Sequence, residues 1–466
     1  MISKNGFLSQ EDLFNIGVGK MAQVNKLSTE TVSVSFFKYL IPSLIGMALM
    51  SINIVIDGIF VGHGVGSTAL AGVNIAAPVF SIILSIALLI GVGGGAVYSI
   101  ALGAGEVGYA QRIFTTSFAL LTVIIILITS LSLFFIKDLA YFFGANKDTL
   151  PFVLEYMKIL LLFGLLMAWE TSLSVFVRND GNPNLAMVGL IITSLLNIGL
   201  NYYMIFILHL GVTGAAIATV ISVGVGLVVL LTHFFKKDTV LKFVPIKWNK
   251  ADIKQINLIG FPSFVSEVGM GVFTIGYNIA IAYYAGTIGL AAFSVLNYLH
   301  TFMFLLFMGV GSTIQPMISY YHGAGLSKNI TDTIKIAEKT AIVLGGLFLI
   351  IGLLAANSLV AMFGVTSDEI AEMAVRGIRL FFTGYIFMGI NFIYLTYFQA
   401  IGHVKPSIWI TLFRGFILLI MMLLILPQVI GVNGVWLALP VSEAIVTIVL
   451  LYFVRGSIVG SKRQSI

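Results

Sequence analysis

Twelve runs of apolar residues, each long enough to cross a lipid bilayer, dominate this sequence of 466 residues. A membrane-spanning helix needs about 20 mainly apolar residues. Hydrophobic residues make up 59% of the chain and charged residues only 9%, a balance that a water-soluble fold of this size does not keep in solution. We therefore predict an integral membrane protein.

The runs form two sets of six. The first set covers 36–60, 74–99, 113–136, 152–176, 184–208 and 212–235, and the second covers 256–284, 289–314, 338–362, 373–400, 406–430 and 433–455. Lipid tolerates only helices and closed barrels as spanning structures. Because the runs are continuous and do not alternate with a period of two, we expect an all-α integral membrane protein with 12 transmembrane helices.

The second set repeats the first at an offset of 220 residues. At this offset Pro42 aligns with Pro262 and Gly211 with Gly431, and the further pairs are Ser43 with Ser263, Gly103-Ala-Gly105 with Gly323-Ala-Gly325, and Gly214 with Gly434. Six crossings is an even number, so both copies enter the membrane in the same orientation. We expect two six-helix lobes related by a pseudo-twofold axis along the membrane normal, with a cavity between them.

The expected organisation has five parts. They are an N-terminal segment (1–35), an N-lobe (36–235), a lysine-rich linker (236–255), a C-lobe (256–455) and a C-terminal tail (456–466). The linker carries Pro245 and separates the two sets of apolar runs.

The positive charges predict the orientation, because Lys and Arg gather in cytoplasmic loops. If the N-terminus is cytoplasmic, all but five of the 25 Lys and Arg residues fall on the cytoplasmic side, and those five are Lys137, Lys147, Lys158, Arg376 and Arg379. We expect both termini in the cytoplasm and both the N-terminal segment and the linker on that side. Since the charges are spread over many loops, they suit anionic lipid rather than nucleic acid.

Asp57 lies inside the first apolar run. A charged side chain at the bilayer centre costs about 2.5–3.5 kcal/mol on insertion scales, so Asp57 needs a partner or a water-filled cavity. Asn53 precedes it by one helical turn, and Thr193, Asn197 and Asn201 form a polar stripe at four-residue spacing in the fifth run. The two stripes predict an oxygen-rich pocket. The alternative is that these side chains only tie helices together by hydrogen bonds.

Other polar and aromatic residues inside the runs are candidates for the lining of a substrate cavity. Aromatic faces attract organic cations, and methionine adapts to varied shapes. The candidates are Asn53, Glu170, Tyr277, Tyr298, His300, Tyr385 and Asn391. Ordinary core packing is the alternative for each. Glu443 also lies within a run, and Arg414 is expected either to pair with Glu170 or Glu443 or to extend to the membrane surface.

Gly91-Val-Gly-Gly-Gly95 lies within a spanning run and no Gly-Lys-Ser or Gly-Lys-Thr follows it, so we interpret it as a close helix contact rather than a phosphate loop. Without an ATPase signature, active transport would depend on an ion gradient. The chain has no cysteine, which excludes disulfides and thiolate metal sites.

Several short motifs follow one another along the chain: Pro42, Val55-Ile-Asp-Gly-Ile-Phe-Val-Gly62, Leu70-Ala71-Gly72, Gly181-Asn182-Pro183, Asn197-Ile-Gly-Leu-Asn201, Gly211-Val-Thr-Gly-Ala-Ala-Ile-Ala-Thr219, Gly260-Phe-Pro262 with Glu267, Gln315-Pro316 and Gly323-Ala-Gly325. In this order and within a doubled six-helix layout, they resemble the MATE (multidrug and toxic compound extrusion) transporters over residues 36–455. The later motifs look most like the MepA-like bacterial branch.

The resemblance implies a secondary active multidrug antiporter that exports amphipathic or cationic compounds in exchange for H⁺ or Na⁺ by alternating access. Asp57 matches the cation-coupling aspartate of the family, and Asn197, Asn201 and Thr219 match its surrounding ligands. Many members have a second acid where this chain has Asn201. The single formal charge suits Na⁺ at Asp57, Asn197 and Asn201 with neutral oxygen ligands, or a proton alone.

The resemblance also gives Glu267 in the second lobe a role in cation coupling or in attracting cationic substrates, and a helix-end hydrogen bond is the alternative. The usual acidic companion of this glutamate in the tenth helix is missing, and Asn391 and Gln399 are the nearest polar candidates. Pro42 and Pro262 match positions where the family is proposed to bend its helices, and a static kink is the alternative.

By the same resemblance the protein is not an enzyme, needs no cofactor beyond the coupling ion, and acts as a monomer in the bacterial plasma membrane. Its partners would be small-molecule drugs, organic cations and membrane lipids, without nucleic acid. A lipid or specific-metabolite exporter of the same superfamily and a non-transporting membrane scaffold remain as alternatives.

Overall fold

The computed structural model describes residues 27, 29–365 and 367–463, and no β-strand occurs among them. The helices are α2 (Val32–Gly64), α3 (Ser67–Gly103), α4 (Val107–Phe134), α5 (Ile136–Phe142), α6 (Leu150–Leu162), α7 (Gly164–Asn179), α8 (Pro183–Tyr202), α9 (Gly211–Leu231), α10 (Lys250–Gly323), α11 (Ser327–Leu354), α12 (Ala356–Met362), α13 (Asp368–Phe381), α14 (Tyr385–Ala400), α15 (Val404–Leu412), α16 (Leu418–Ile430) and α17 (Val432–Arg463). Short π-helical turns extend α8 (η2, Tyr203–Ile207) and join α15 to α16 (η5, Phe413–Ile417).

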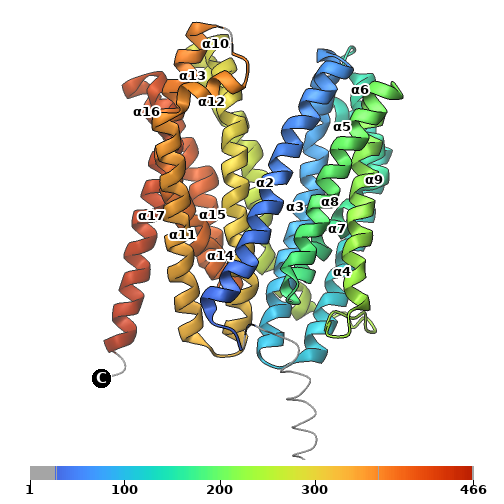
Figure 1. The fold of residues 1–466 in the computed structure, drawn as a ribbon, viewed down its shortest axis with the longest axis vertical. Coiled ribbons are helices and arrows are strands. Elements are labelled where there is room, and N and C mark those ends of the chain that lie inside the picture. The colour runs from blue at the N-terminus through green and yellow to red at the C-terminus, as the bar shows by residue number, and fades with distance from the viewer. Residues whose placement is uncertain (1–26, 28, 366, 464–466) are drawn as a thin grey trace, which may run out of the picture.

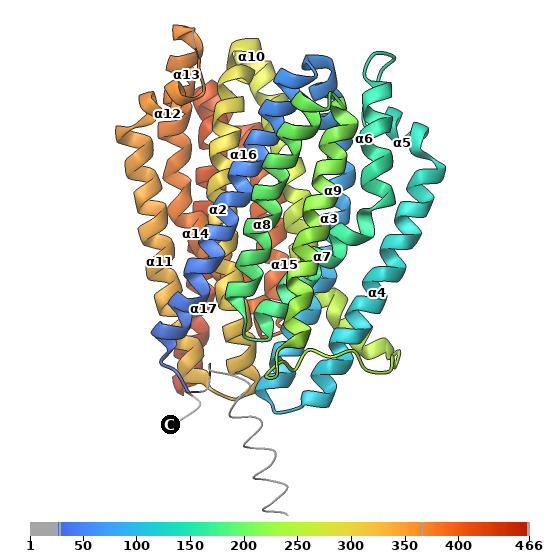
Figure 2. The same ribbon diagram turned by 45° about the vertical axis from the view of Figure 1, so that its right-hand side comes forward.

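Figure 1 shows two upright groups of helices, and Figure 2 shows the same helices turned by 45°. One group contains α3 to α9, and the other contains α11 to α17 together with much of α10. We call them the N-terminal and C-terminal lobes, and α2 runs obliquely between them (Figure 1). The expectation of an all-α bundle of two lobes is confirmed.

Within the described residues, ten helices are long and apolar enough to cross a membrane, and the bent pair α6 and α7 makes one more span. The 74 residues of α10 correspond to about 110 Å of helix, several times a bilayer's thickness. At Gly286 the backbone leaves the helical region with φ 57° and ψ −149°, so α10 provides two spans and the total of twelve crossings is confirmed.

Two predicted runs are interrupted. The run 152–176 bends by 54° between α6 and α7, at Phe163. The run 338–362 is confirmed as one span, within α11, but the helix ends at Leu354 and a separate short helix, α12, follows Ala355. The break at Phe163 is followed at once by Gly164, the first residue of α7, whereas the break at Ala355 has neither proline nor glycine beside it. Only the first break therefore had a possible signal in the sequence.

Turns at equivalent places in the two repeats use the same residue type. Gly105 after α3 and Gly325 after α10 have φ of 79° and 70°. This left-handed conformation suits glycine and ends a helix with an abrupt change of direction.

Each lobe has its own core, but the two lobes exchange the first turns of their leading helices. The leading helix is the first helix of each repeat, namely α2 in the first repeat and the part of α10 before Gly286 in the second. Phe36, Tyr39 and Leu40 of α2 are buried in the core of the C-terminal lobe. At the repeat offset, Phe36 and Tyr39 correspond to Ile256 and Ile259 of α10, which are buried in the core of the N-terminal lobe. The leading helix of each repeat therefore starts in the opposite lobe.

The lobes touch closely where α3 meets α10. A Cβ atom on Gly103 would overlap the carbonyl oxygen of Tyr320, and a Cβ atom on Gly323 would overlap the carbonyl oxygen of Ile100. These two contacts exchange places at the 220-residue offset. Only glycine allows such a close backbone approach, so this contact lies on the pseudo-twofold axis and needs both glycines.

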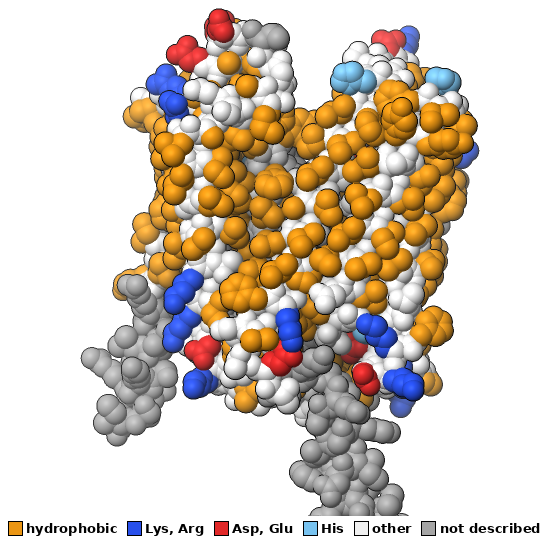
Figure 3. All heavy atoms as spheres, in the orientation of Figure 1, with side chains coloured by type: hydrophobic (Ala, Val, Ile, Leu, Met, Phe, Trp, Pro, Cys, Tyr) orange, Lys and Arg blue, Asp and Glu red, His pale blue; other side chains and the backbone are white. Residues whose placement is uncertain are grey.

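The end of the molecule where this contact lies also carries the turns at 104–106 and 324–326 and the segment 236–249, and we call it the basic end. It is the lower end in Figure 3, where several Lys and Arg side chains gather below a broad belt of hydrophobic side chains. At the upper end the surface is hollowed between the two lobes (Figure 3). The lobes therefore close at the basic end and separate at the other.

Candidate cation and substrate site

Asp57 of α2 meets the polar stripe of α8 inside the N-terminal lobe. Its Oδ1 accepts a hydrogen bond of 2.6 Å from Asn201 Nδ2. One turn earlier, Asn53 Nδ2 donates to Asn197 Oδ1 at 2.7 Å and to the Ser194 carbonyl at 3.4 Å. The two stripes predicted from sequence spacing thus face each other, with Asp57 half-buried and both α8 amides buried.

Asn197 is the centre of this cluster. One of its side-chain amide atoms lies 2.8 Å from Asp57 Oδ1, 3.1 Å from Asn201 Nδ2 and 2.7 Å from Asn53 Nδ2, and the other lies 3.2 Å from the Thr219 hydroxyl. As a nitrogen the first atom donates to the carboxylate, whereas as an oxygen it accepts from the two amides. The amide therefore finds hydrogen-bond partners in either orientation.

Asn201 Oδ1 is buried and has no hydrogen-bond partner in the part of the chain that the structure describes. A buried oxygen without a donor costs about 1–3 kcal/mol of free energy, so its place beside Asp57 suits a cation or a protonated carboxyl group. The oxygens near it come from one carboxylate, amides and the Thr219 hydroxyl, which are ligands that hard cations prefer. Among the described residues no group of three His, Cys, Asp or Glu side chains could hold a metal ion.

The polar stripe of α8 continues toward the basic end to Glu170 of α7. Thr193 Oγ1 donates to Glu170 Oε1 at 3.5 Å, and Glu170 is buried. A Cβ atom on Gly226 of α9 would overlap Thr193 Oγ1, so the glycine makes room for this pair. Glu170 thus lies inside the N-terminal lobe. Its partner Thr193 precedes Asn201 by about two helical turns of α8.

Glu267 of α10 is half-buried and has no hydrogen bond or ion pair with any described residue. The two candidates for its missing companion are engaged elsewhere. Gln399 Nε2 donates to the Ile259 carbonyl at 2.7 Å and to Ser263 Oγ at 2.9 Å, while Asn391 Nδ2 donates to Glu443 Oε2 at 2.6 Å. The structure therefore does not join Glu267 to either of them.

Four of the candidate cavity residues lie inside the C-terminal lobe. Tyr277, Tyr385 and Asn391 are fully buried, and His300 is buried with its Nδ1 3.2 Å from the Tyr385 hydroxyl. None of these four faces the space between the lobes in this conformation. Tyr298 differs, because its side chain is 40% exposed and a Cβ atom on Gly58, next to Asp57, would lie 3.7 Å from its hydroxyl.

Pro42 and Pro262 lie inside continuous helices, just after the segments that the lobes exchange. Pro42 follows Leu40 of the C-terminal core by two residues, and Pro262 follows Ile259 of the N-terminal core by three. A proline removes one helix hydrogen bond. Both prolines therefore stand where a helix passes from one lobe to the other.

Arg414 pairs with Glu443 and not with Glu170. Arg414 Nε and Nη2 lie 3.0 Å and 2.9 Å from Glu443 Oε1, which decides between the partners that the sequence left open.

Sequence reasoning missed a hydrogen-bonded amide pair between the lobes, Asn179 and Gln315. The repeat could have indicated these positions. At the 220-residue offset, Asn179 corresponds to Gln399 and its hydrogen-bond partner Ser99 corresponds to Ser319, so polar residues recur at equivalent places in both repeats.

Comparison with known proteins also finds two repeats and a transporter family. The MatE family model matches residues 42–203 and again 262–425, two stretches that begin 220 residues apart. The chain is 26% identical over 455 residues to the multidrug export protein MepA of Staphylococcus saprophyticus, covering 96% of this chain and 99% of that protein. It is 29% identical over 426 residues to MepA of Staphylococcus aureus, covering 89% and 92%.

A solved structure described as the outward-facing conformation of a multidrug resistance MATE family transporter of the MOP superfamily is similar to the whole chain. Its TM-score is 0.89 at 24% sequence identity, with 94% of this chain and 98% of that chain covered. At this identity the likeness establishes the fold.

Proposed function

Because the chain belongs to the MatE family of membrane transporters, we propose that it exports amphipathic and cationic drugs in exchange for H⁺ or Na⁺. It is a multi-pass membrane transporter and not an enzyme. Its likeness to multidrug export proteins over nearly the whole chain supports multidrug efflux. The coupling ion and the exchange step belong to the proposal.

The observation that carries this proposal is the cluster around Asp57. It combines one ionisable oxygen ligand, a buried Asn201 Oδ1 without a donor, and an Asn197 amide that finds hydrogen-bond partners in either orientation. A cation or proton arriving at Asp57 would supply the missing partner and neutralise the buried charge. This gain in binding free energy is available for shifting the conformational equilibrium, provided that the two states bind the ion differently.

The positive-inside rule supports a cytoplasmic location for the basic end and for both termini. With that orientation, the conformation is open to the outside and closed to the cytoplasm. The coupling ion would enter from outside and bind at Asp57, with Asn197, Asn201 and Thr219 around it. The lobes would then part along the α3–α10 contact, and a drug would enter from the cytoplasm.

Glu267 and Tyr298 fit secondary roles in this scheme. Glu267 lacks a charge partner, so it suits attraction of a cationic substrate, and Tyr298 offers an exposed ring beside α2 that suits a cation–π contact. We propose Asn53 and Glu170 as polar groups that extend the Asp57 cluster, since hydrogen bonds link Asn53 to Asn197 and Glu170 to Thr193.

The proposed setting is the plasma membrane of a bacterium, as the bacterial relatives suggest. We expect a monomer that requires no cofactor besides H⁺ or Na⁺, contacts anionic lipid through its basic loops, and has no nucleic-acid partner.

The test is dye transport in liposomes. Purified protein would be reconstituted, and ethidium movement followed under a pH gradient and a Na⁺ gradient imposed separately, for wild type and Asp57→Asn. We expect transport under one gradient and its loss in the variant, with folding and ethidium binding retained. Wild-type rates for a well-folded Asp57→Asn protein would falsify the coupling role. If wild type moves ethidium under neither gradient, lipid-linked and metabolite substrates replace drugs as the next candidates.

A further inference from the structure

The two lobes differ in chemistry at equivalent positions of the repeat. At the offset of 220 residues, Asp57 corresponds to Tyr277 and Thr219 to Leu439. In the C-terminal lobe the Leu439 backbone N–H donates to the Tyr277 hydroxyl at 3.0 Å. The Tyr277 ring stacks on the Phe293 ring, with 5.2 Å between the ring centroids. The C-terminal lobe thus holds an aromatic wall where the N-terminal lobe holds a cation cluster.

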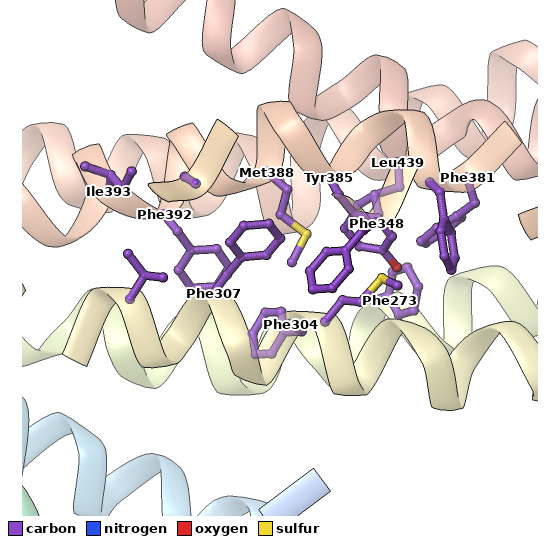
Figure 4. Close-up of a cluster of buried hydrophobic side chains, with 14 of the residues drawn as sticks. Phe273, Phe304, Phe307, Phe348, Phe381, Tyr385, Met388, Phe392, Ile393 and Leu439 are labelled. Atoms are coloured by element: carbon purple, nitrogen blue, oxygen red, sulfur yellow. The ribbon is translucent and has the colours of Figure 1, made fainter. Parts of the chain in front are cut away.

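A small cavity of about 40 Å³ lies beside this wall, between α10, α14, α15, η5, α16 and α17. Its apolar side includes Phe273 and Phe304 of α10 and Met388 of α14. Figure 4 shows Phe304 and Met388 within the same buried cluster, on neighbouring helices. One buried water needs roughly 10–15 Å³ of such space, so the cavity has room for a small polar group at the end of a larger molecule.

Arg414 and Glu443 form the polar side of this cavity. They are 7% and 1% exposed. Both Arg414 contacts go to Glu443 Oε1, whereas Oε2 accepts from Asn391, whose own oxygen accepts a 3.0 Å bond from Thr447. Glu443 is therefore held on both oxygens and holds the guanidinium in one orientation.

The guanidinium has donors left over. Its carbon lies 4.2 Å from the centre of the Phe392 ring, and its Nη1 has no acceptor among the described residues. Arginine carries five N–H donors in a fixed plane, and the bonds to Glu443 come from Nε and Nη2 only. A buried ion pair often adds little net stability. This pair leaves charged donors beside an aromatic cavity.

We propose that Arg414 and this cavity form a substrate subsite in the C-terminal lobe for an oxygen acceptor, a carboxylate or carbonyl, attached to an aromatic ring. This deepens the proposed export function and rests on it. The acceptor enters the cavity and binds the free edge of Arg414. The attached ring is larger than the cavity, so it packs on Phe273, Phe304 and Met388 only when these side chains move apart. Glu443 acts as a positioning residue that keeps the guanidinium aimed at the cavity.

The subsite predicts which drugs gain binding affinity from Arg414 in the C-terminal lobe. A permanent organic cation without acceptor oxygens, such as ethidium, gains nothing from Arg414. A compound with an aromatic ring, a ring carbonyl and a carboxylate, such as norfloxacin, gains charge-assisted hydrogen bonds. Decarboxylated norfloxacin keeps the ring carbonyl alone, so it separates the contributions of the two acceptor groups.

The test measures binding of these three probes to purified protein in detergent, without any gradient. Removing only one member of the pair would leave a buried charge and destabilise the fold, so the main variant is Arg414→Leu with Glu443→Leu. Arg379→Leu, an exposed arginine of the same lobe, is the matched control. We expect the double variant to lose about tenfold in norfloxacin affinity, as for a lost hydrogen bond to a charged group, while ethidium affinity and Tm stay unchanged.

Glu443→Gln keeps the bond from Asn391 but leaves the Arg414 charge without its partner, so we expect a lower Tm. In the folded fraction we expect a smaller loss for norfloxacin than in the double variant and again none for ethidium. Equal norfloxacin binding by wild type and the double variant overturns the subsite, as does the absence of norfloxacin binding by wild type. A parallel loss of both compounds also overturns it, since the pair then supports only the fold. Failure of the proposed function appears separately, as missing gradient-driven ethidium movement in liposomes.

Discussion

Asn179 of α7 and Gln315 of α10 join the two lobes through a reciprocal pair of hydrogen bonds. Asn179 Nδ2 donates to Gln315 Oε1 at 3.0 Å, and Gln315 Nε2 donates to Asn179 Oδ1 at 3.1 Å. Both residues are buried. Ser99 Oγ donates to the same Asn179 oxygen at 2.6 Å, and Gln315 Nε2 also reaches Ser319 Oγ at 3.3 Å. These bonds must break if the lobes part at the basic end.

We predict that replacing both amides by leucine favours the state that is open at the basic end. The double variant removes the paired bonds without leaving one buried amide unpaired, which would cost more than the bond itself contributes. Losing two net hydrogen bonds of about 1 kcal/mol each shifts the equilibrium by roughly thirtyfold.

Spin labels at Ser67→Cys and Thr287→Cys would measure this shift, because both positions are exposed near the hollowed end. The natural chain has no cysteine, so the labels attach only there. The inter-label distance is expected to shorten in the double leucine variant. An unchanged distance distribution would show that the amide pair does not hold the lobes closed.

The glycine contact on the pseudo-twofold axis leads to a second prediction. An alanine at position 323 places a Cβ atom into the Ile100 carbonyl oxygen, and overpacking of this kind costs typically about 1–3 kcal/mol. We expect Gly323→Ala to open the basic end, with the same shortening between the labels. Gly346→Ala is the matched control, because it lies within α11 and a Cβ atom there meets no neighbouring atom within 4 Å. Identical behaviour of the two variants would contradict a closing role for the contact.

The repeat in the sequence predicted the symmetry of this contact but not its partners. Pairing Gly103 with Gly323 at a fixed offset shows that two positions are equivalent, whereas their mutual approach depends on how α3 and α10 cross. Four-residue spacing placed Asn197 and Asn201 on one face of a helix. Polar side chains within a membrane face the interior of the helix bundle and pair with other polar groups, and Asp57 is such a group. The local pattern and the tertiary requirement agreed at this site.

Other features had no local signal. Arg414 could reach either of two buried acids, and only the packing of η5 against α17 selects Glu443. The aromatic residues Tyr277 and Tyr385 are buried in the C-terminal core and do not face the space between the lobes. The sequence pattern alone does not distinguish a ring that packs inward from one that lines a cleft. The exchange of leading helices is also invisible locally, since Phe36 and Ile256 are simply apolar residues at helix starts.

The third prediction concerns Asn201, whose side chain both donates to Asp57 and carries an unpartnered oxygen. Asn201→Leu removes both features. We expect the apparent Kd of the coupling ion to rise about tenfold, the value of one bond to a charged group, with ethidium binding unchanged. The measurement is the ion dependence of dye efflux in liposomes. Asn257→Leu is the control, because among the described residues the Asn257 side chain bonds only to the Ile253 carbonyl of its own helix. An unaltered ion dependence in Asn201→Leu would remove this residue from the cation site.

The fourth prediction concerns Pro42, which separates the part of α2 held by the C-terminal core from the part that meets α8. Since proline has no N–H, the Lys38 carbonyl lacks its helical partner, and α2 is easier to bend there. In Pro42→Ala that hydrogen bond can form, so bending costs about 1 kcal/mol more. We expect gradient-driven ethidium efflux to slow by roughly fivefold, while ethidium binding stays the same.

Pro78→Ala is the control for Pro42→Ala, because Pro78 also lies inside a helix, α3, but does not stand where a leading helix changes lobes. Its efflux rate is expected to match wild type. The two exchanged segments are equivalent, so Pro262→Ala should slow efflux in the same way as Pro42→Ala. If neither Pro42→Ala nor Pro262→Ala changes the rate, then both prolines are static kinks, and the lobes move without bending their leading helices.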